Sequence, residues 1–199
     1  MADITAAMVR ELRDRTGAGM MDCKRALEEA GGEMDRAITL LRERGLAAAA
    51  KKAGREASEG LVSSYIHTGG RVGVLIEVNC ETDFVARTDK FQDLVRLLAI
   101  QVAGLSPQWV DVDQIPADVL DAKRTELAAD TSVASKPADI REKIVDGQLK
   151  KWFKDVVLLE QPFRDTDRSV RDIVTEAIAT IGENIQVRRF ARFALGEDR

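Results

Sequence analysis

The spacing of the hydrophobic side chains changes along the chain, and this change limits the possible folds more than any other feature of the sequence. Apolar residues recur at helical intervals over residues 4–41, alternate at the two-residue interval of a β-strand over residues 61–78, and return to helical intervals over residues 84–105. A further strand-like alternation occupies residues 185–195. These segments predict an α+β fold, in which a small antiparallel sheet carries helices on one face.

Residues 1–45 predict a module of three short helices. Ile4, Met8 and Leu12 recur at the four-residue interval of one helix face, and Thr5 can cap this first helix. Glycines are expected to end the three helices: Gly17, Gly31 and Gly45. Three helices of roughly ten residues share only a small core, so we expect the module to lean on another part of the protein.

Residues 61–66 and 71–78 predict a β-hairpin, because both segments alternate and Gly69-Gly70 stands between them. Six apolar residues are expected on the face that packs against helices: Val62, Ile66, Val72, Val74, Ile76 and Val78. Four others are expected on the opposite face: Leu61, Tyr65, Leu75 and Phe190. Exposed apolar side chains on a small sheet favour a second copy of the chain as a partner, so we expect a homodimer.

A helical hairpin is expected as an insertion in the sheet domain. Residues 117–156 are charged and helical, with a break at Ser135-Lys136-Pro137. They predict two helices, Ala117–Thr131 and Ala138–Val156, which project as a thin antiparallel pair because they carry few large apolar residues.

The last strand-like segment is expected to align four apolar residues on one face: Ile185, Val187, Phe193 and Leu195. The predicted domains are a three-helix module (1–45), a helical linker (46–60) and an α+β domain (61–199) with the insertion at about 117–156.

Composition argues against several classes of protein. The 199 residues include 30 Lys and Arg against 34 Asp and Glu, and this acidic balance argues against nucleic acid as the main partner. No stretch approaches the ~20 apolar residues that span a membrane, and the N-terminus lacks the apolar region of a signal peptide. We therefore expect a cytoplasmic protein with reduced thiols.

The residue types that catalysis needs are scarce. His67 is the single histidine and is expected at the surface, at the end of the hairpin. Cys23 and Cys80 lack the spacing of a metal site, and no P-loop motif occurs. The sequence predicts no enzyme, metal site or cofactor. An enzyme with a nucleophilic cysteine is one alternative, although both cysteines fall where inert thiols are expected.

Two long motifs resemble those of one known family. Residues 12–27, LRDRTGAGMMDCKRAL, resemble the N-terminal signature of the bacterial translation elongation factor Ts family. Residues 77–87, EVNCETDFVAR, resemble its second signature, and IGENI at 181–185 also fits. The resemblance covers essentially the whole chain. The chain resembles a short form of the family, with one sheet subdomain where longer members carry two. Two independent long motifs are far more specific than a single short pattern.

The resemblance implies a guanine-nucleotide exchange factor that binds elongation factor Tu in its GDP-bound and nucleotide-free states. It implies that one turn disturbs the magnesium and nucleotide site of Tu: Thr82, Asp83, Phe84 and Val85. It also implies that a UBA-like N-terminal module contacts Tu through five residues: Leu12, Arg13, Met20, Met21 and Lys24. It implies that the helical pair is a further contact element, and the expected homodimer would give a complex of two Tu and two Ts chains.

The residues themselves leave alternatives open at these sites. Phe84 follows a strand and opens a helix, where a phenylalanine more often belongs to the core and Thr82 or Asp83 is ordinarily an N-cap. Met20 and Met21 can fill the small helical core or lie exposed as adaptable contacts.

An RNA-binding helical protein of the translation apparatus is the alternative function. It rests on the basic pairs Lys150-Lys151 and Arg188-Arg189, which are few in an acidic chain. We therefore expect no direct binding of nucleic acid.

Overall fold

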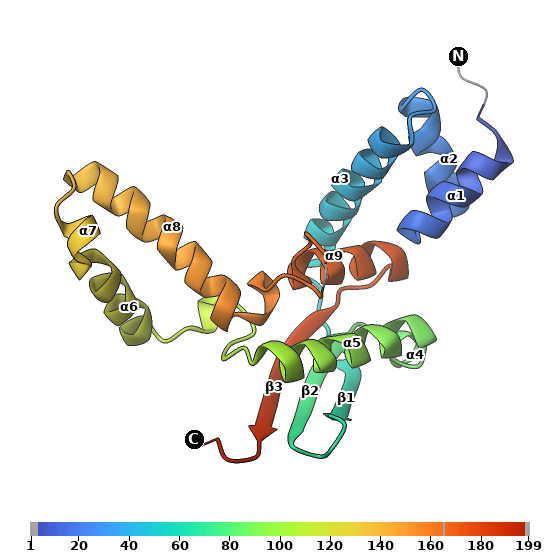
Figure 1. Cartoon of the computed structure of the whole chain (residues 1–199). Helices are drawn as coiled ribbons and strands as arrows, with labels where there is room; N and C mark the ends of the chain where they lie inside the picture. The colour runs from blue at the N-terminus through green and yellow to red at the C-terminus, as the bar shows by residue number, and fades with distance from the viewer. Residues whose placement is uncertain (1–3, 165, 198–199) are drawn as a thin grey trace. The chain divides into compact units, whose positions relative to one another are not determined.

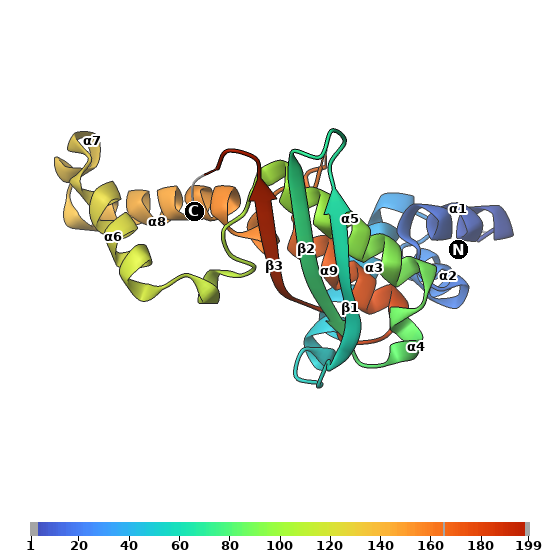
Figure 2. The ribbon, with the colours of Figure 1, turned by 90° about the horizontal axis from the view of Figure 1, so that it is seen from below.

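The computed structural model describes residues 4–164 and 166–197, apart from the Ala134 side chain (Figure 1). In chain order the α-helices are α1 (Ala6–Thr16), α2 (Met20–Glu29), α3 (Met34–Lys52), α4 (Asp83–Ala86), α5 (Asp89–Leu105), α6 (Ala117–Ala129), α7 (Thr131–Ala134), α8 (Ala138–Val156) and α9 (Val170–Ile181). The strands β1 (Glu59–Ile66), β2 (Val72–Cys80) and β3 (Gln186–Ala194) lie side by side in that order (Figure 2). This arrangement confirms the α+β class.

The chain divides into two compact units, which are described separately. The first unit consists of Met1–Leu61, Val78–Leu94 and Asp172–Gln186. The second unit consists of Val62–Glu77, Val95–Arg171 and Val187–Arg199. The boundary between these units passes through α5 and the sheet, so it differs from the boundaries of the predicted module, linker and sheet domain. The predicted domains stay a prediction.

Helices α1, α2 and α3 pack around a small apolar core in the first unit. Thr5 caps α1, its hydroxyl oxygen accepting a hydrogen bond from the Met8 N–H at 3.3 Å. Gly17 ends α1 with a φ of 66°, a conformation that favours glycine. The buried core residues come from all three helices and the turn after α2: Val9, Leu12, Cys23, Ala26, Leu27, Ala30 and Ala37. The three helices occur as predicted, while the UBA-like character of the module stays a prediction.

The prediction that Gly45 ends the third helix is wrong. Helix α3 continues through Gly45 to Lys52, so part of the predicted linker belongs to it. Glycine inside a helix costs only about 1 kcal/mol relative to alanine, and the alanines that follow have the highest helix propensity. A Cβ atom at Gly45 would lie 3.3 Å from the Cβ of Ala179, so glycine permits a close approach of α3 to α9.

The hairpin of β1 and β2 forms as predicted, but the face of β1 that was expected to be covered is the exposed one. The buried face of β2 carries three predicted residues: Val74, Ile76 and Val78. Val62 and Ile66 were expected to be covered with them, yet they are 69% and 65% exposed, whereas Leu61 and Tyr65 are half-buried. Both alternating sets of β1 are apolar, so the pattern alone does not choose the buried face.

The residues expected to share one face of β3 differ in exposure. Ile185, just before the strand, is buried, but Phe193 and Leu195 are exposed. The Arg192 side chain lies on the opposite face, where its Nε donates to a backbone carbonyl oxygen of α5 at 3.4 Å. Since neighbouring residues of a strand point to opposite faces, this contact directs Phe193 outward. Phe190, expected on the exposed face, shares the face of Arg192 and is half-buried.

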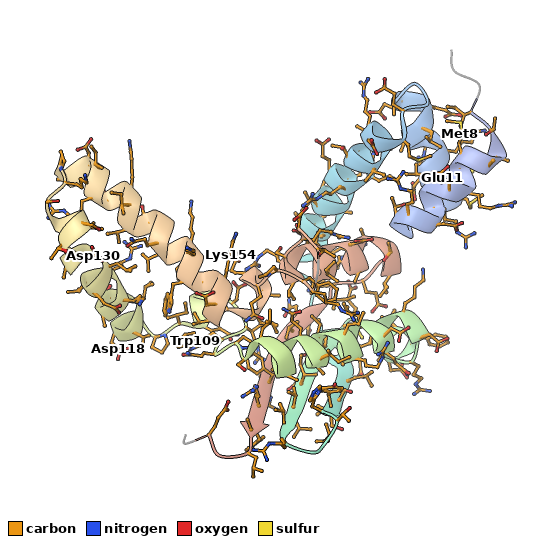
Figure 3. The ribbon with its side chains drawn as sticks, viewed as in Figure 1. Met8, Glu11, Trp109, Asp118, Asp130 and Lys154 are labelled. Atoms are coloured by element: carbon orange, nitrogen blue, oxygen red, sulfur yellow. The ribbon has the colours of Figure 1, made fainter. Side chains whose placement is uncertain are left out.

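The predicted helical hairpin is present in the second unit as α6 and α8, with the short α7 at its tip. Helix α8 has the predicted bounds, while α6 ends at Ala129 instead of Thr131. Asp130 leaves the helical conformation and caps α7, its carboxylate accepting from the Ser132 N–H at 2.8 Å. Figure 3 shows Asp130 near this tip and Trp109 near the base of the pair.

Candidate functional site

The turn after β2 presents Thr82, Asp83, Phe84 and Val85 in the first unit. Thr82 caps the short helix α4, because its hydroxyl oxygen accepts a hydrogen bond from the Val85 N–H at 3.3 Å. Asp83 begins α4 and forms an ion pair with Arg87 at 2.8 Å, one helical turn further on. Thr82 is therefore the N-cap, and Asp83 is exposed beside it.

Phe84 lies on the surface with 83% of its area exposed. Val85 is half-buried and Ala86 is buried, so α4 is anchored through its last residues while the aromatic ring stays outside the core. The expectation that a phenylalanine at this position belongs to the core is wrong. A large exposed aromatic ring is typical of the residues that contribute most to protein–protein interfaces.

Two carboxylates connect the backbone just before α4 with the segment after α9. Glu183 Oε2 accepts hydrogen bonds from the N–H groups of Glu81 and Thr82, both at 3.0 Å, and Glu183 Oε1 accepts from the Thr82 hydroxyl at 2.6 Å. Glu81 Oε1 accepts from the Asn184 N–H at 2.6 Å. Sequence reasoning gave Glu183 and Asn184 no role. The one signal was their place in the IGENI motif, directly after the helix-ending Gly182.

Both cysteine thiols are buried and free. Burial, together with the negative charge of Glu183, raises the pKa of the Cys80 thiol, which donates to the Thr82 carbonyl oxygen at 3.1 Å. Burial also raises the pKa of Cys23 and outweighs the hydrogen bond with Thr16, which lowers it. The thiolate is the reactive form of cysteine, so these raised pKa values argue against a nucleophilic role for either residue.

The N-terminal module exposes two thioethers at the start of α2. Met20 is 45% and Met21 is 66% exposed, so neither methionine belongs to the core of the module. Arg13 and Lys24 are also exposed. Leu12, in contrast, is fully buried, which corrects the expectation that it contacts a partner: its side chain holds the helices together from inside.

Other kinds of site have little support in the described part of the chain. Across residues 4–164 and 166–197, no group of three or more His, Cys, Asp or Glu side chains is placed to hold a metal ion. His67 is exposed, as expected, and its Nδ1 lies 3.0 Å from the Tyr65 hydroxyl. In the same ranges, every helix is too short or too polar to span a bilayer.

The exposed ring of Phe84 and the exposed methionines, on an α+β fold, are typical of a protein-binding surface. The family model described as Elongation factor TS matches residues 28–168, which is more than half of the chain. The chain belongs to the elongation factor Ts family and is therefore a translation elongation factor, which confirms the resemblance of its two motifs.

The similar proteins cover the chain almost from end to end. Elongation factor Ts of Carboxydothermus hydrogenoformans is 58% identical over 195 residues, which are 98% of this chain and 90% of that protein. The Elongation factor Ts proteins of Anaeromyxobacter sp. (strain Fw109-5) and Synechococcus elongatus are 58% and 56% identical over alignments of 199 positions, which cover 99% of this chain and 90% of each relative. The similarity therefore includes both the N-terminal module and the turn around Phe84.

Proposed function

We propose that the chain is a guanine-nucleotide exchange factor that promotes the release of GDP from elongation factor Tu in the cytoplasm. The observation that carries this proposal is the exposed Phe84 ring on α4, directly after the exposed carboxylate of Asp83. Membership of the Ts family supports it, because this activity is what the resemblance implies. In this proposal Phe84 enters Tu close to its magnesium and nucleotide site.

The proposed mechanism makes and breaks no covalent bond, so the chain acts as a binding protein and not as an enzyme. It binds nucleotide-free Tu more tightly than GDP-bound Tu, and by reciprocity the affinity of Tu for GDP falls by the same factor. Each tenfold change needs about 1.4 kcal/mol of differential binding. Burial of the Phe84 ring in a gap that opens only when the magnesium region moves supplies roughly 1.5–3 kcal/mol, enough for one to two tenfold steps.

The neighbours of Phe84 have distinct roles in this mechanism. Asp83 competes for polar groups near the magnesium ion of Tu, and its ion pair with Arg87 at 2.8 Å restricts its carboxylate in the free chain. Thr82 caps α4, and the half-buried Val85 attaches it to the body. The chain itself holds no magnesium in this proposal.

The N-terminal module contributes affinity. Met20 and Met21 offer flexible, polarisable side chains that adapt to a partner surface, and Arg13 and Lys24 add positive charge nearby in the sequence. Because these residues are separate from Phe84, the module can set how tightly Tu is bound while the turn sets how far GDP is loosened.

The outer face of the sheet in the second unit supports a homodimer. Five apolar residues are exposed on or next to it: Val62, Ile66, Leu75, Phe193 and Leu195. Four of them, all except Val62, line an open groove of about 600 Å³. An isologous contact between two copies would cover this face and give a complex of two Tu and two Ts chains.

The RNA-binding alternative has less support. Arg189 forms an ion pair with Glu77 at 2.7 Å, so one of the four basic residues behind that hypothesis is already paired. No observation favours a nucleic-acid site over a protein-binding one.

Release of labelled GDP from purified Tu, with and without the full chain, tests the proposal. We expect the release rate to rise with chain concentration and to saturate. A rate that stays at the value of Tu alone, at concentrations where the two proteins co-sediment, would overturn exchange activity.

A further inference from the structure

We propose that Glu183 is a positioning residue for exchange: its carboxylate fixes the backbone that presents Phe84. This inference rests on the proposed function and goes beyond the turn itself, because Glu183 lies in a different segment of the chain. The three hydrogen bonds from Glu81 and Thr82 to this carboxylate have lengths of 3.0, 3.0 and 2.6 Å. One side chain therefore holds two consecutive residues directly before α4.

Helix α4 depends on such support because it is very short. Asp83–Ala86 is a single turn, and one helical turn is unstable on its own. The exposed Phe84 ring has little packing to orient it, so its direction follows the backbone of residues 81–83. The Thr82 hydroxyl also connects the two features, since it donates to Glu183 and accepts from the Val85 N–H.

A second set of contacts places Glu183 opposite the turn. Gly182 ends α9 with a φ of 96°, which an L side chain rarely adopts, and Glu183 follows it. Asn184 is 2% exposed; its backbone N–H donates to Glu81, and its Nδ2 donates to the Arg55 carbonyl oxygen at 2.8 Å. The neighbours of Glu183 are therefore tied to the same turn and to the segment after α3.

Loss of the Glu183 carboxylate should lower the fraction of chains in which the turn points Phe84 in the direction that exchange requires. If Phe84 points in the productive direction in only a fraction of the bound chains, the stimulated rate of GDP release falls to that fraction of its full value. A turn that is competent about one tenth of the time lowers the maximal stimulated rate of GDP release about tenfold. The N-terminal module is unaltered, so the chain concentration at half-maximal rate should change much less.

Four chains measured side by side test this inference: wild type, Glu183→Gln, Glu183→Ala and Glu197→Ala. Glu197 is a matched control, because its carboxylate also accepts hydrogen bonds, from Arg192 of β3 at 2.8 and 2.7 Å, and both residues belong to the second unit. We expect Glu183→Ala to lower the saturating rate about tenfold and Glu183→Gln, which keeps one acceptor oxygen, to lower it less. Glu197→Ala should behave as wild type.

The same substitutions in a Phe84→Ala chain separate positioning from general stability. If Glu183 acts through Phe84, Glu183→Ala should lower the saturating rate no further in that background. An equal additional loss there, or a wild-type saturating rate in Glu183→Ala, overturns the inference while exchange activity stands. If wild type itself fails to stimulate GDP release, the proposed function fails, and the positioning role fails with it.

Discussion

Glu81 and Glu183 lie 102 residues apart in the sequence, yet each accepts a hydrogen bond from the backbone beside the other. Glu183 accepts from the N–H groups of Glu81 and Thr82, and Glu81 accepts from the N–H of Asn184. This reciprocal arrangement satisfies three backbone donors at the end of β2 and the end of α9. The Arg55 guanidinium lies 3.5 Å from the Glu81 carboxylate.

Replacing Phe84 separates its binding role from stability. We expect Phe84→Ala to slow GDP release at saturating chain concentration by one to two tenfold steps, because the ring supplies roughly 1.5–3 kcal/mol of differential binding. Its side chain is exposed, so the free energy of unfolding should change by less than about 0.5 kcal/mol. Thermal unfolding and GDP release of the one variant measure both effects.

Phe91 provides the matched control, because its ring is fully buried at the start of α5. Phe91→Ala should lower the free energy of unfolding by about 3–5 kcal/mol. A Phe84→Ala chain that unfolds early but exchanges normally while folded would contradict the proposed role of its ring.

Replacing Met21 tests the role of the N-terminal module. We expect Met21→Ala to raise the chain concentration at half-maximal GDP release by about tenfold, because a partner-covered methionine supplies roughly 1.5–3 kcal/mol. The saturating rate should stay near wild type, since the turn is unaltered. Titration of Tu with each chain gives both values.

Leu12→Ala is the informative comparison, because Leu12 is buried in the core of the same module. It should lower the stability of the module by about 2–5 kcal/mol and should weaken binding only as the module unfolds. If Met21→Ala binds Tu as tightly as wild type, the exposed thioethers contribute nothing to the interface.

Apolar spacing predicted those elements in which one face is clearly more apolar than the other. It gave the buried face of β2, because Val74, Ile76 and Val78 alternate with less apolar neighbours over most of the strand. The start of α8 followed instead from the break at Ser135-Lys136-Pro137. Apolar spacing could not orient β1, whose two faces are equally apolar. It could not show which side chains face outward at the end of β3 either, because the long-range contact of Arg192 with α5 determines this.

The candidate site was predictable only in part, for a related reason. The motif around Phe84 identified the turn, but burial depends on tertiary packing, and the sequence alone favoured a core phenylalanine. The contacts of Glu183 with Glu81 and Thr82 join distant segments, and no local pattern reports such a contact.

The buried thiols predict how stability changes at alkaline pH. The pKa values of Cys23 and Cys80 are raised above the ordinary 9.0, so the folded chain holds these protons more tightly than the unfolded chain. Their contribution to the free energy of unfolding is therefore complete below pH 9.0 and is lost as the pH rises through the folded-state values. Denaturant unfolding at pH 8 and pH 10 should show a larger decrease for wild type than for a Cys23→Ala, Cys80→Ala chain. Equal decreases would show that the thiols do not contribute.

The outer face of the sheet predicts the oligomeric state. Leu75 and Phe193 are exposed on this face in the second unit and line the same groove. We expect the wild-type chain to sediment as a dimer at micromolar concentration and Leu75→Glu to sediment as a monomer, because two buried, unpaired carboxylates would oppose an isologous contact. Sedimentation velocity across a concentration series measures this change.

Leu46→Glu is the control for a charge placed at any exposed leucine. Leu46 is about as exposed as Leu75 but lies on α3 in the first unit. Leu46→Glu introduces the same charge and should leave the dimer intact. The exchange activity of Leu75→Glu then shows whether dimerisation matters for function. If each copy carries a complete Phe84 turn and N-terminal module, the monomeric variant should stimulate GDP release from Tu as much per chain as wild type does. A wild-type chain that is monomeric at micromolar concentration and fully active would rule out the homodimer as the working form.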